Sequence, residues 1–202
     1  DYSQNPYRAE SDSIIRKWNL GVTENDRGEY RKGKLVDPAH PVVFYIDTCC
    51  PTEFVPYIKE GVLAWNAAFE KAGFKNALRV KMADSKTVLE EQRAVIAYDL
   101  HEAGIRTGYT FHPKTGEILS CRVNIGHGFL PKELWRYVLE CGTVDDRIRK
   151  EFFHPDVVGE ILRSKVIRAV GSVLGLKENL AGSAAYTAEQ VKSVAWLKQH
   201  GY

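Results

Sequence analysis

The sequence lacks the features that mark several large classes of protein. It has no basic block and no basic stripe interleaved with aromatic residues, and its formal net charge is only +2, so nucleic acid is not expected as a partner. No apolar run approaches the length that crosses a bilayer, so no membrane span is expected. No two cysteines have the C-x-x-C spacing of a zinc ribbon or a redox site.

Cysteine and methionine are both scarce. The four cysteines are Cys49, Cys50, Cys121 and Cys141, and the only methionine is Met82. Adjacent cysteines do not easily bond to each other, and a cysteine at the end of a strand is most often a small buried apolar residue. We therefore expect free thiols, with a structural disulfide as the alternative.

The composition is that of a globular chain. Of its 202 residues, 44% are hydrophobic and 27% are charged, which is enough to bury a sizeable core. We expect an extended N-terminal arm over residues 1–40, docked through Trp18, and one domain over residues 41–202. The chain begins at Asp1 with neither a methionine nor a signal peptide, so we expect a processed or excised piece.

Hydrophobic runs of strand length predict a sheet. Strands are expected at residues 42–47, 78–82, 94–98, 108–111 and 117–125. The first, VVFYID, is continuously apolar and is expected to be a central strand buried on both faces. The segment between residues 99 and 108 is interpreted as a surface loop that holds His101 and Glu102.

Helices are expected between and after these strands. One helix is predicted over residues 52–73, capped by Thr52, closed by Gly73 and packed through Trp65 and Phe69. A strand, helix, strand order requires a crossover and hence a parallel pair. The fold class is therefore α/β or α+β, with a twisted mixed sheet of four or five strands.

The longest apolar stripe at helical spacing lies near the C-terminus. It predicts a buried helix over residues 156–174 that ends at Gly175, because glycine readily takes the left-handed conformation of a helix C-terminus. After it, Thr187 and Gln190 form a capping box that starts a last helix over residues 188–200.

The turn from the long helix into Gly175 resembles the active-site segment of the metzincin zinc proteases. The metzincin pattern is His-Glu-x-x-His-x-x-Gly-x-x-His, and Gly175 stands at its glycine. A second stretch, residues 46–77, resembles the first strand and helix of large bacterial zinc-dependent metalloproteases with metzincin-like catalytic domains. The resemblance implies a zincin-like fold, a secreted, periplasmic or cell-surface location in a bacterium, zinc in active relatives, and an antiparallel edge strand that pairs with an extended substrate.

The residues that carry zinc hydrolysis in that family are replaced here. Arg168, Ser172 and Glu178 stand at the three ligand positions, and Ala169 stands at the general base. Arginine stays protonated, serine is a poor zinc ligand, and alanine cannot accept a proton. We therefore expect no catalytic residues, no bound metal and no cofactor. The family also has a methionine turn after the third histidine, whereas the only methionine here, Met82, lies far upstream, so we expect that portion to have been either cut off or lost.

The remaining histidines do not suggest another metal site. His101, His112, His127 and His154 are scattered without the spacing of a ligand set. We interpret His127, in GHGF, as part of a solvated loop.

Three functions remain open at this stage. The first is a metalloprotease-like domain without activity that binds a peptide or protein through the old cleft or the sheet edge, with an Arg168 and Glu178 ion pair in the metal's place. The second is a divergent zinc-dependent metallopeptidase whose ligands come from elsewhere. The third is a structural scaffold within a larger secreted protein. A serine nucleophile at Ser172 is a poor fourth choice, because the chain has no Gly-x-Ser-x-Gly elbow.

Overall fold

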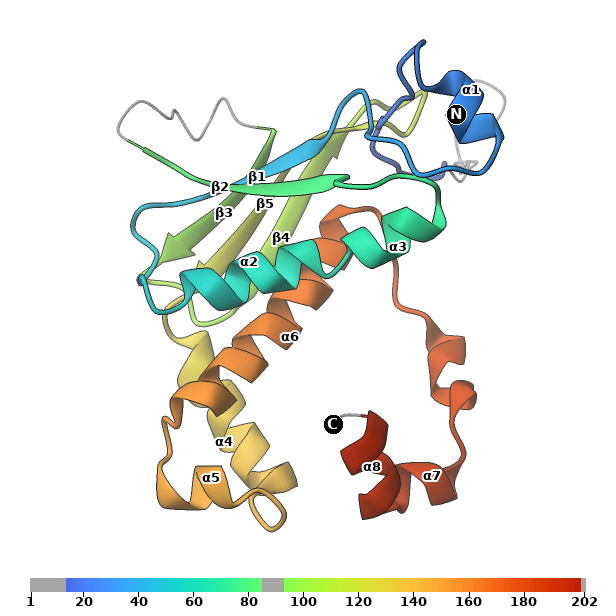
Figure 1. Cartoon of the computed structure of the whole chain (residues 1–202). Coiled ribbons are helices and arrows are strands. Elements are labelled where there is room, and N and C mark those ends of the chain that lie inside the picture. The colour runs from blue at the N-terminus through green and yellow to red at the C-terminus, as the bar shows by residue number, and fades with distance from the viewer. Residues whose placement is uncertain (1–13, 85–92, 201–202) are drawn as a thin grey trace, which may run out of the picture.

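A five-stranded mixed sheet forms one layer of the molecule, and the helices from α2 to α8 gather on one side of it (Figure 1). The computed structural model describes residues 14–84 and 93–200. The strands are β1 (Val42–Ile46), β2 (Leu78–Met82), β3 (Ala94–Asp99), β4 (Ile105–Phe111) and β5 (Ile118–Gly126). The expected mixed sheet of four or five strands is confirmed.

The strand order, β2-β1-β3-β5-β4, places β4 at one edge. β1 pairs in parallel with both β2 and β3, and β3 pairs in parallel with β5, whereas β4 pairs antiparallel with β5. The predicted parallel pairing is therefore confirmed. The loop expected between residues 99 and 108 is wrong in its second half, because Ile105 to Thr107 pair with β5 and extend β4. His101 and Glu102 do lie in the connection before β4.

Burial along β1 alternates. Val42, Phe44 and Ile46 are buried beneath the helices, while Val43 and Tyr45 are only half-buried. The expectation of a strand buried on both faces is therefore wrong, although β1 does lie between two neighbours. The helices cover one face of the sheet, and an apolar run of strand length does not by itself reveal this.

The helix expected over residues 52–73 is divided into α2 (Val55–Leu63) and α3 (Asn66–Lys71). Two anchors hold the break between them. The Trp65 indole donates to the carbonyl oxygen of Ile167 at 2.9 Å, and the Asn66 side chain bonds both the N–H and the C=O of Leu78. Thr52 does not cap α2 with its side chain, since the N-cap residue is Phe54.

The long helix is present as α6 (Pro155–Val173), within one residue of the predicted bounds at each end. Gly175 follows it with a φ of +96°, as its predicted role at the helix end requires. A Cβ at Gly61 of α2 would lie 2.8 Å from Val166 of α6, so the two helices pack at close range. Their buried faces form the core with the sheet.

The other helices are α1 (Arg27–Arg31), α4 (Phe129–Cys141), α5 (Asp146–Lys150), α7 (Ala188–Lys192) and α8 (Val194–His200), with a 3-10 helix at Leu180–Ala185. The capping box of Thr187 and Gln190 is confirmed, but the last helix is divided at Ser193, whose backbone is extended. In the described residues no helix is both long and apolar enough to cross a membrane.

The start of the described chain docks on the end of α6. The Trp18 indole donates to the carbonyl oxygen of Val173 at 3.1 Å, which confirms the predicted anchor. Lys17 forms an isolated parallel bridge with Glu117. A Cβ at Gly175 would lie only 2.6 Å from the carbonyl oxygen of Arg16, so the two segments are in close contact. The Arg16 guanidinium donates a hydrogen bond to the Tyr109 hydroxyl.

A polar network joins α4, α5 and α6. Asp145 accepts hydrogen bonds from the Arg147 backbone and guanidinium and from the Tyr137 hydroxyl, and Arg147 also pairs with Glu160 at 2.9 Å. These hydrogen bonds hold the pKa of the Asp145 carboxyl well below its ordinary value, and those from the Arg147 side chain contribute most. The carboxylate is only 13% exposed, so solvent screens the interaction little.

We expect Asp145→Asn to lower the free energy of unfolding at pH 7 by about 1 to 3 kcal/mol, since asparagine keeps the helix cap and removes the charge. The folded pKa lies below the unfolded value near 3.9, so this contribution is complete above about pH 5 and fades as the pH falls below about 4. Urea unfolding of the unmodified chain and the variant at pH 7 and pH 3 measures both the loss of stability and its dependence on pH. The matched control is Asp146→Asn, whose carboxylate is 68% exposed and should change stability little. An equal loss at both pH values would contradict the prediction.

Candidate functional site

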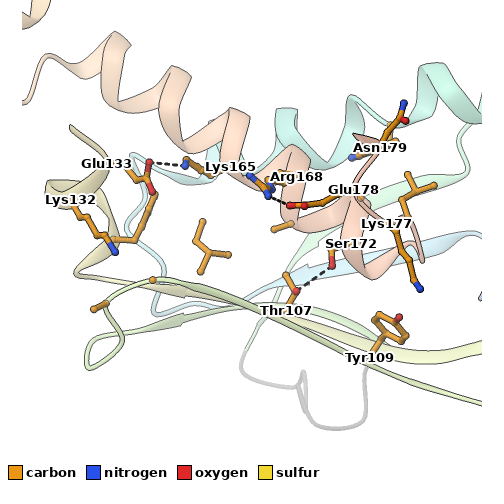
Figure 2. Close-up of a pocket in the computed structure, with 18 of the residues that line it drawn as sticks. Thr107, Tyr109, Lys132, Glu133, Lys165, Arg168, Ser172, Lys177, Glu178 and Asn179 are labelled. Carbon is orange, nitrogen blue, oxygen red and sulfur yellow. Dashed lines mark hydrogen bonds and ion pairs between the residues drawn. The ribbon is translucent and has the colours of Figure 1, made fainter. Parts of the chain in front are cut away.

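A cleft of about 1170 Å³ lies between the edge strand β4 and the helix α6 (Figure 2). Ile105, Thr107 and Tyr109 line it from β4. These are alternate positions, and alternate side chains of a strand share one face. In the described part of the chain β4 has no strand partner other than β5, so its second edge is open. The cleft therefore has an unpaired strand edge beside it.

The opposite wall is one stripe of α6. Lys165, Arg168, Ala169 and Ser172 follow the i, i+3, i+4, i+7 spacing that places side chains on one face of a helix. Three of them are the predicted motif positions. The degenerate motif therefore faces the cleft, as the corresponding residues of a working protease would.

The fourth motif position, Glu178, reaches the cleft from the segment after α6. Gly175 turns the chain with its positive φ, and Glu178 then forms an ion pair with Arg168 (Figure 2). The predicted contact between the first and third ligand positions is thus confirmed. The pair is solvent-exposed, with 75% of the Arg168 side chain and 72% of the Glu178 side chain accessible.

Ser172, at the second ligand position, lies against the strand. Its hydroxyl oxygen is 3.4 Å from the Thr107 hydroxyl oxygen, so these two side chains connect α6 to β4 within the cleft. Ala169 beside it is buried. A serine whose described hydrogen-bond partner is a threonine has no base to activate it, which argues against nucleophilic catalysis here.

Charged side chains lie at both ends of the cleft. At the end near α4, Lys165 pairs with Glu133 at 2.6 Å, and Lys132 lies next to them. At the other end Lys177 lies beside Glu178 in the segment after Gly175. Sequence reasoning missed Lys132, Glu133, Lys165 and Lys177, because none belongs to the family motif. The helical spacing from Lys165 to Ser172 is the signal that could have found Lys165.

The residues at the motif positions do not fit zinc. A zinc site needs histidine nitrogens, thiolates or carboxylates in a convergent set, and Arg168, Ser172 and Glu178 together supply only one such group. Arg168 is moreover a permanent cation that already holds that carboxylate. Within residues 14–84 and 93–200 no cluster of three or more His, Cys, Asp or Glu side chains is arranged to hold a metal ion.

The other histidines have separate local contacts. His112 Nδ1 accepts from the backbone of the turn between β4 and β5, and His127 Nδ1 is 2.7 Å from the Tyr98 hydroxyl oxygen. His127 is exposed in the turn after β5, as expected. His154 precedes the first turn of α6, and its buried Nδ1 has no hydrogen-bond partner in the described structure. These side chains do not line the cleft.

Residues 150–202 of the chain match a protein family described as Met-zincin. The matched segment includes α6, the turn at Gly175, and the helices that follow. It therefore covers the whole degenerate motif. No curated protein and no solved structure matched the chain.

Proposed function

We propose that this chain, whose residues 150–202 match the Met-zincin family, is a metalloprotease-like domain without catalytic activity that binds an extended peptide or protein segment. The bound segment would lie in the cleft between β4 and α6. The proposed domain spans residues 41–202, and residues 1–40 form an arm.

The ion pair between Arg168 and Glu178 carries the proposal. In an active relative the corresponding positions hold zinc ligands, and the metal would connect α6 to the segment after the glycine turn. In this chain a guanidinium and a carboxylate make that connection directly. The two side chains stand at two of the three positions that would hold the metal in such a relative.

The metal and the general base that this chain lacks each lower the barrier to peptide hydrolysis in the active family. A metal-bound water and a polarised carbonyl each contribute several kcal/mol to peptide hydrolysis, and the general base adds to them. Neither Ser172 nor Ala169 can supply a proton acceptor of suitable basicity. The chain nevertheless has a partly apolar groove at this position.

The edge strand supports peptide binding. An unpaired strand edge offers alternating N–H and C=O groups, and an extended peptide satisfies them by adding a strand. β4 has such an edge next to the cleft, and its side chains at alternate positions would contact the side chains of the added peptide.

A zinc-dependent metallopeptidase is the second candidate, favoured by the Met-zincin match alone. Its ligands would have to come from residues outside the motif positions. A scaffold domain, which binds nothing in the cleft, is the third.

Metal content separates the first two candidates. The purified chain is incubated with zinc, freed of excess by desalting, and measured by mass spectrometry beside Arg168→Ala. We expect no retained zinc in either protein, because removing the cation still leaves one carboxylate and one hydroxyl. About one zinc per unmodified chain, the stoichiometry of a catalytic zinc site, would contradict the proposal and favour the metallopeptidase.

A further inference from the structure

We infer that the cleft selects a peptide segment with acidic side chains on both sides of the Arg168 and Glu178 pair. This inference rests on the proposed peptide-binding function and adds the chemical class of the ligand. It follows from the charges that line the cleft and from which of them are already paired.

Cations outnumber anions in the cleft. Its described lining carries four cationic side chains and two anionic ones. The cations are Lys132, Lys165, Arg168 and Lys177, and the anions are Glu133 and Glu178. The whole chain has nearly balanced charge, so the excess in the cleft is local. A groove lined mainly by one sign of charge attracts ligands of the opposite sign.

Both anions are already neutralised within the cleft. Glu133 pairs with Lys165, and Glu178 pairs with Arg168. Lys132 and Lys177 are exposed, and within the described part of the chain neither side chain forms an ion pair or a hydrogen bond. The unpaired positive charge therefore comes from these two lysines.

The two lysines lie at opposite ends of the groove. Figure 2 shows Lys132 on the first turns of α4 and Lys177 beyond the turn after α6, with Arg168 and Glu178 between them. A compact anion could not contact both ends at once. An extended segment along β4 could place one acidic side chain near each lysine, so the geometry favours a peptide with acids on both sides of its centre.

A peptide fits the groove better than a nucleic acid. The open edge of β4 matches the hydrogen-bonding groups of a peptide backbone, which a phosphate backbone lacks. Ile105, Tyr109 and Phe129 also give the lining an apolar component.

Fluorescence anisotropy with labelled peptides tests the inference on the full chain. Three extended peptides of about nine residues, long enough to span a strand of ordinary length, carry glutamate, glutamine or lysine at the same alternate positions. We expect the glutamate peptide to bind at least about fivefold more tightly than the glutamine peptide, and its affinity to fall as salt is raised.

Charge-reversal variants test whether Lys132 and Lys177 cause the preference for acidic peptides. Lys132→Glu and Lys177→Glu should each lower the affinity for the glutamate peptide by about fivefold or more, because each replaces an attraction by a repulsion. The matched control is Lys81→Glu on β2, at the opposite edge of the sheet, which should leave the affinity unchanged.

The outcomes separate this inference from the proposed function. Equal binding of the glutamate and glutamine peptides would overturn the acidic preference and leave peptide binding intact. If no peptide bound, both proposals would be wrong. Equally strong binding of heparin or duplex DNA, weakened by the same two reversals, would show a general polyanion site and overturn the peptide assignment.

Discussion

The triple variant Arg168→His, Ser172→His and Glu178→His is expected to retain about one zinc ion per chain, since three histidines in a convergent arrangement form a zinc site. Residues 168 and 172 are one helical turn apart on the face of α6 that lines the cleft. Glu178 already reaches Arg168 around the Gly175 turn. Histidines at these positions would therefore converge from two segments of the chain.

We expect a Kd for zinc of about 1 μM or tighter, which corresponds to about 8 kcal/mol of binding free energy. Mass spectrometry after desalting gives the stoichiometry, and competition with a chromogenic chelator gives the Kd. Because Ala169 is retained, the variant lacks the general base of the family and should not hydrolyse peptides at an appreciable rate.

A matched control keeps the number of histidines and changes their direction. In Arg163→His, Ser172→His and Glu178→His, the first histidine is moved five residues along α6, which rotates it away from the cleft face. This control should retain no zinc. Equal zinc binding by both variants would mean that position 168 does not converge with positions 172 and 178, and the main support for the proposed function would be lost.

Gly61→Leu is expected to lower the free energy of unfolding by about 3 kcal/mol, at the upper end of the usual cost of overpacking a core. A Cβ at this position would lie 2.8 Å from Cγ1 of Val166, 2.9 Å from its Cβ and 3.0 Å from the carbonyl oxygen of Arg163. The last two atoms belong to or adjoin the backbone of α6, so they cannot move without displacing the helix. A leucine therefore forces α2 and α6 apart.

Thermal unfolding should show a decrease in Tm of about 6 to 12 °C for a chain of this size. The control is Gly28→Leu in α1, where an added Cβ meets no atom within 4 Å and should cost little or slightly stabilise the helix. A Gly61→Leu variant as stable as this control would show that the two helices are not in close contact. Because α6 carries the motif positions, peptide binding should weaken along with stability.

Local sequence patterns were sufficient for the elements that have strong periodicity. The apolar stripe that predicts α6 continues along the whole of this long helix, and competing structures cannot bury such a stripe equally well. The capping box at Thr187 is equally local, because its two hydrogen bonds join residues three positions apart. Patterns of this kind depend on neighbours in the chain and little on the rest of the fold.

Predictions failed where distant contacts decide the outcome. The break at Trp65 depends on a hydrogen bond to Ile167, more than a hundred residues away, and on the attachment of Asn66 to β2. The start of β4 is interpreted as a loop from sequence because only its pairing with β5 makes Ile105 to Thr107 a strand. The apolar spacing of residues 130–141 predicts a helix with Trp135 and Leu139 facing inward, and this is wrong for both residues, because they are 61% and 83% exposed on α4.

The sequence by itself determined the chemistry of the motif positions. That Arg168, Ala169 and Ser172 cannot hold zinc or activate water follows from the side chains alone, wherever the fold places them. The tertiary structure alone decided that these residues face a cleft, that Glu178 returns to Arg168, and that Lys132 and Lys177 lie unpaired at its two ends. The reason is physical: reactivity belongs to a side chain, whereas charge complementarity depends on which side chains from α4, α6 and β4 the packing of the core brings together.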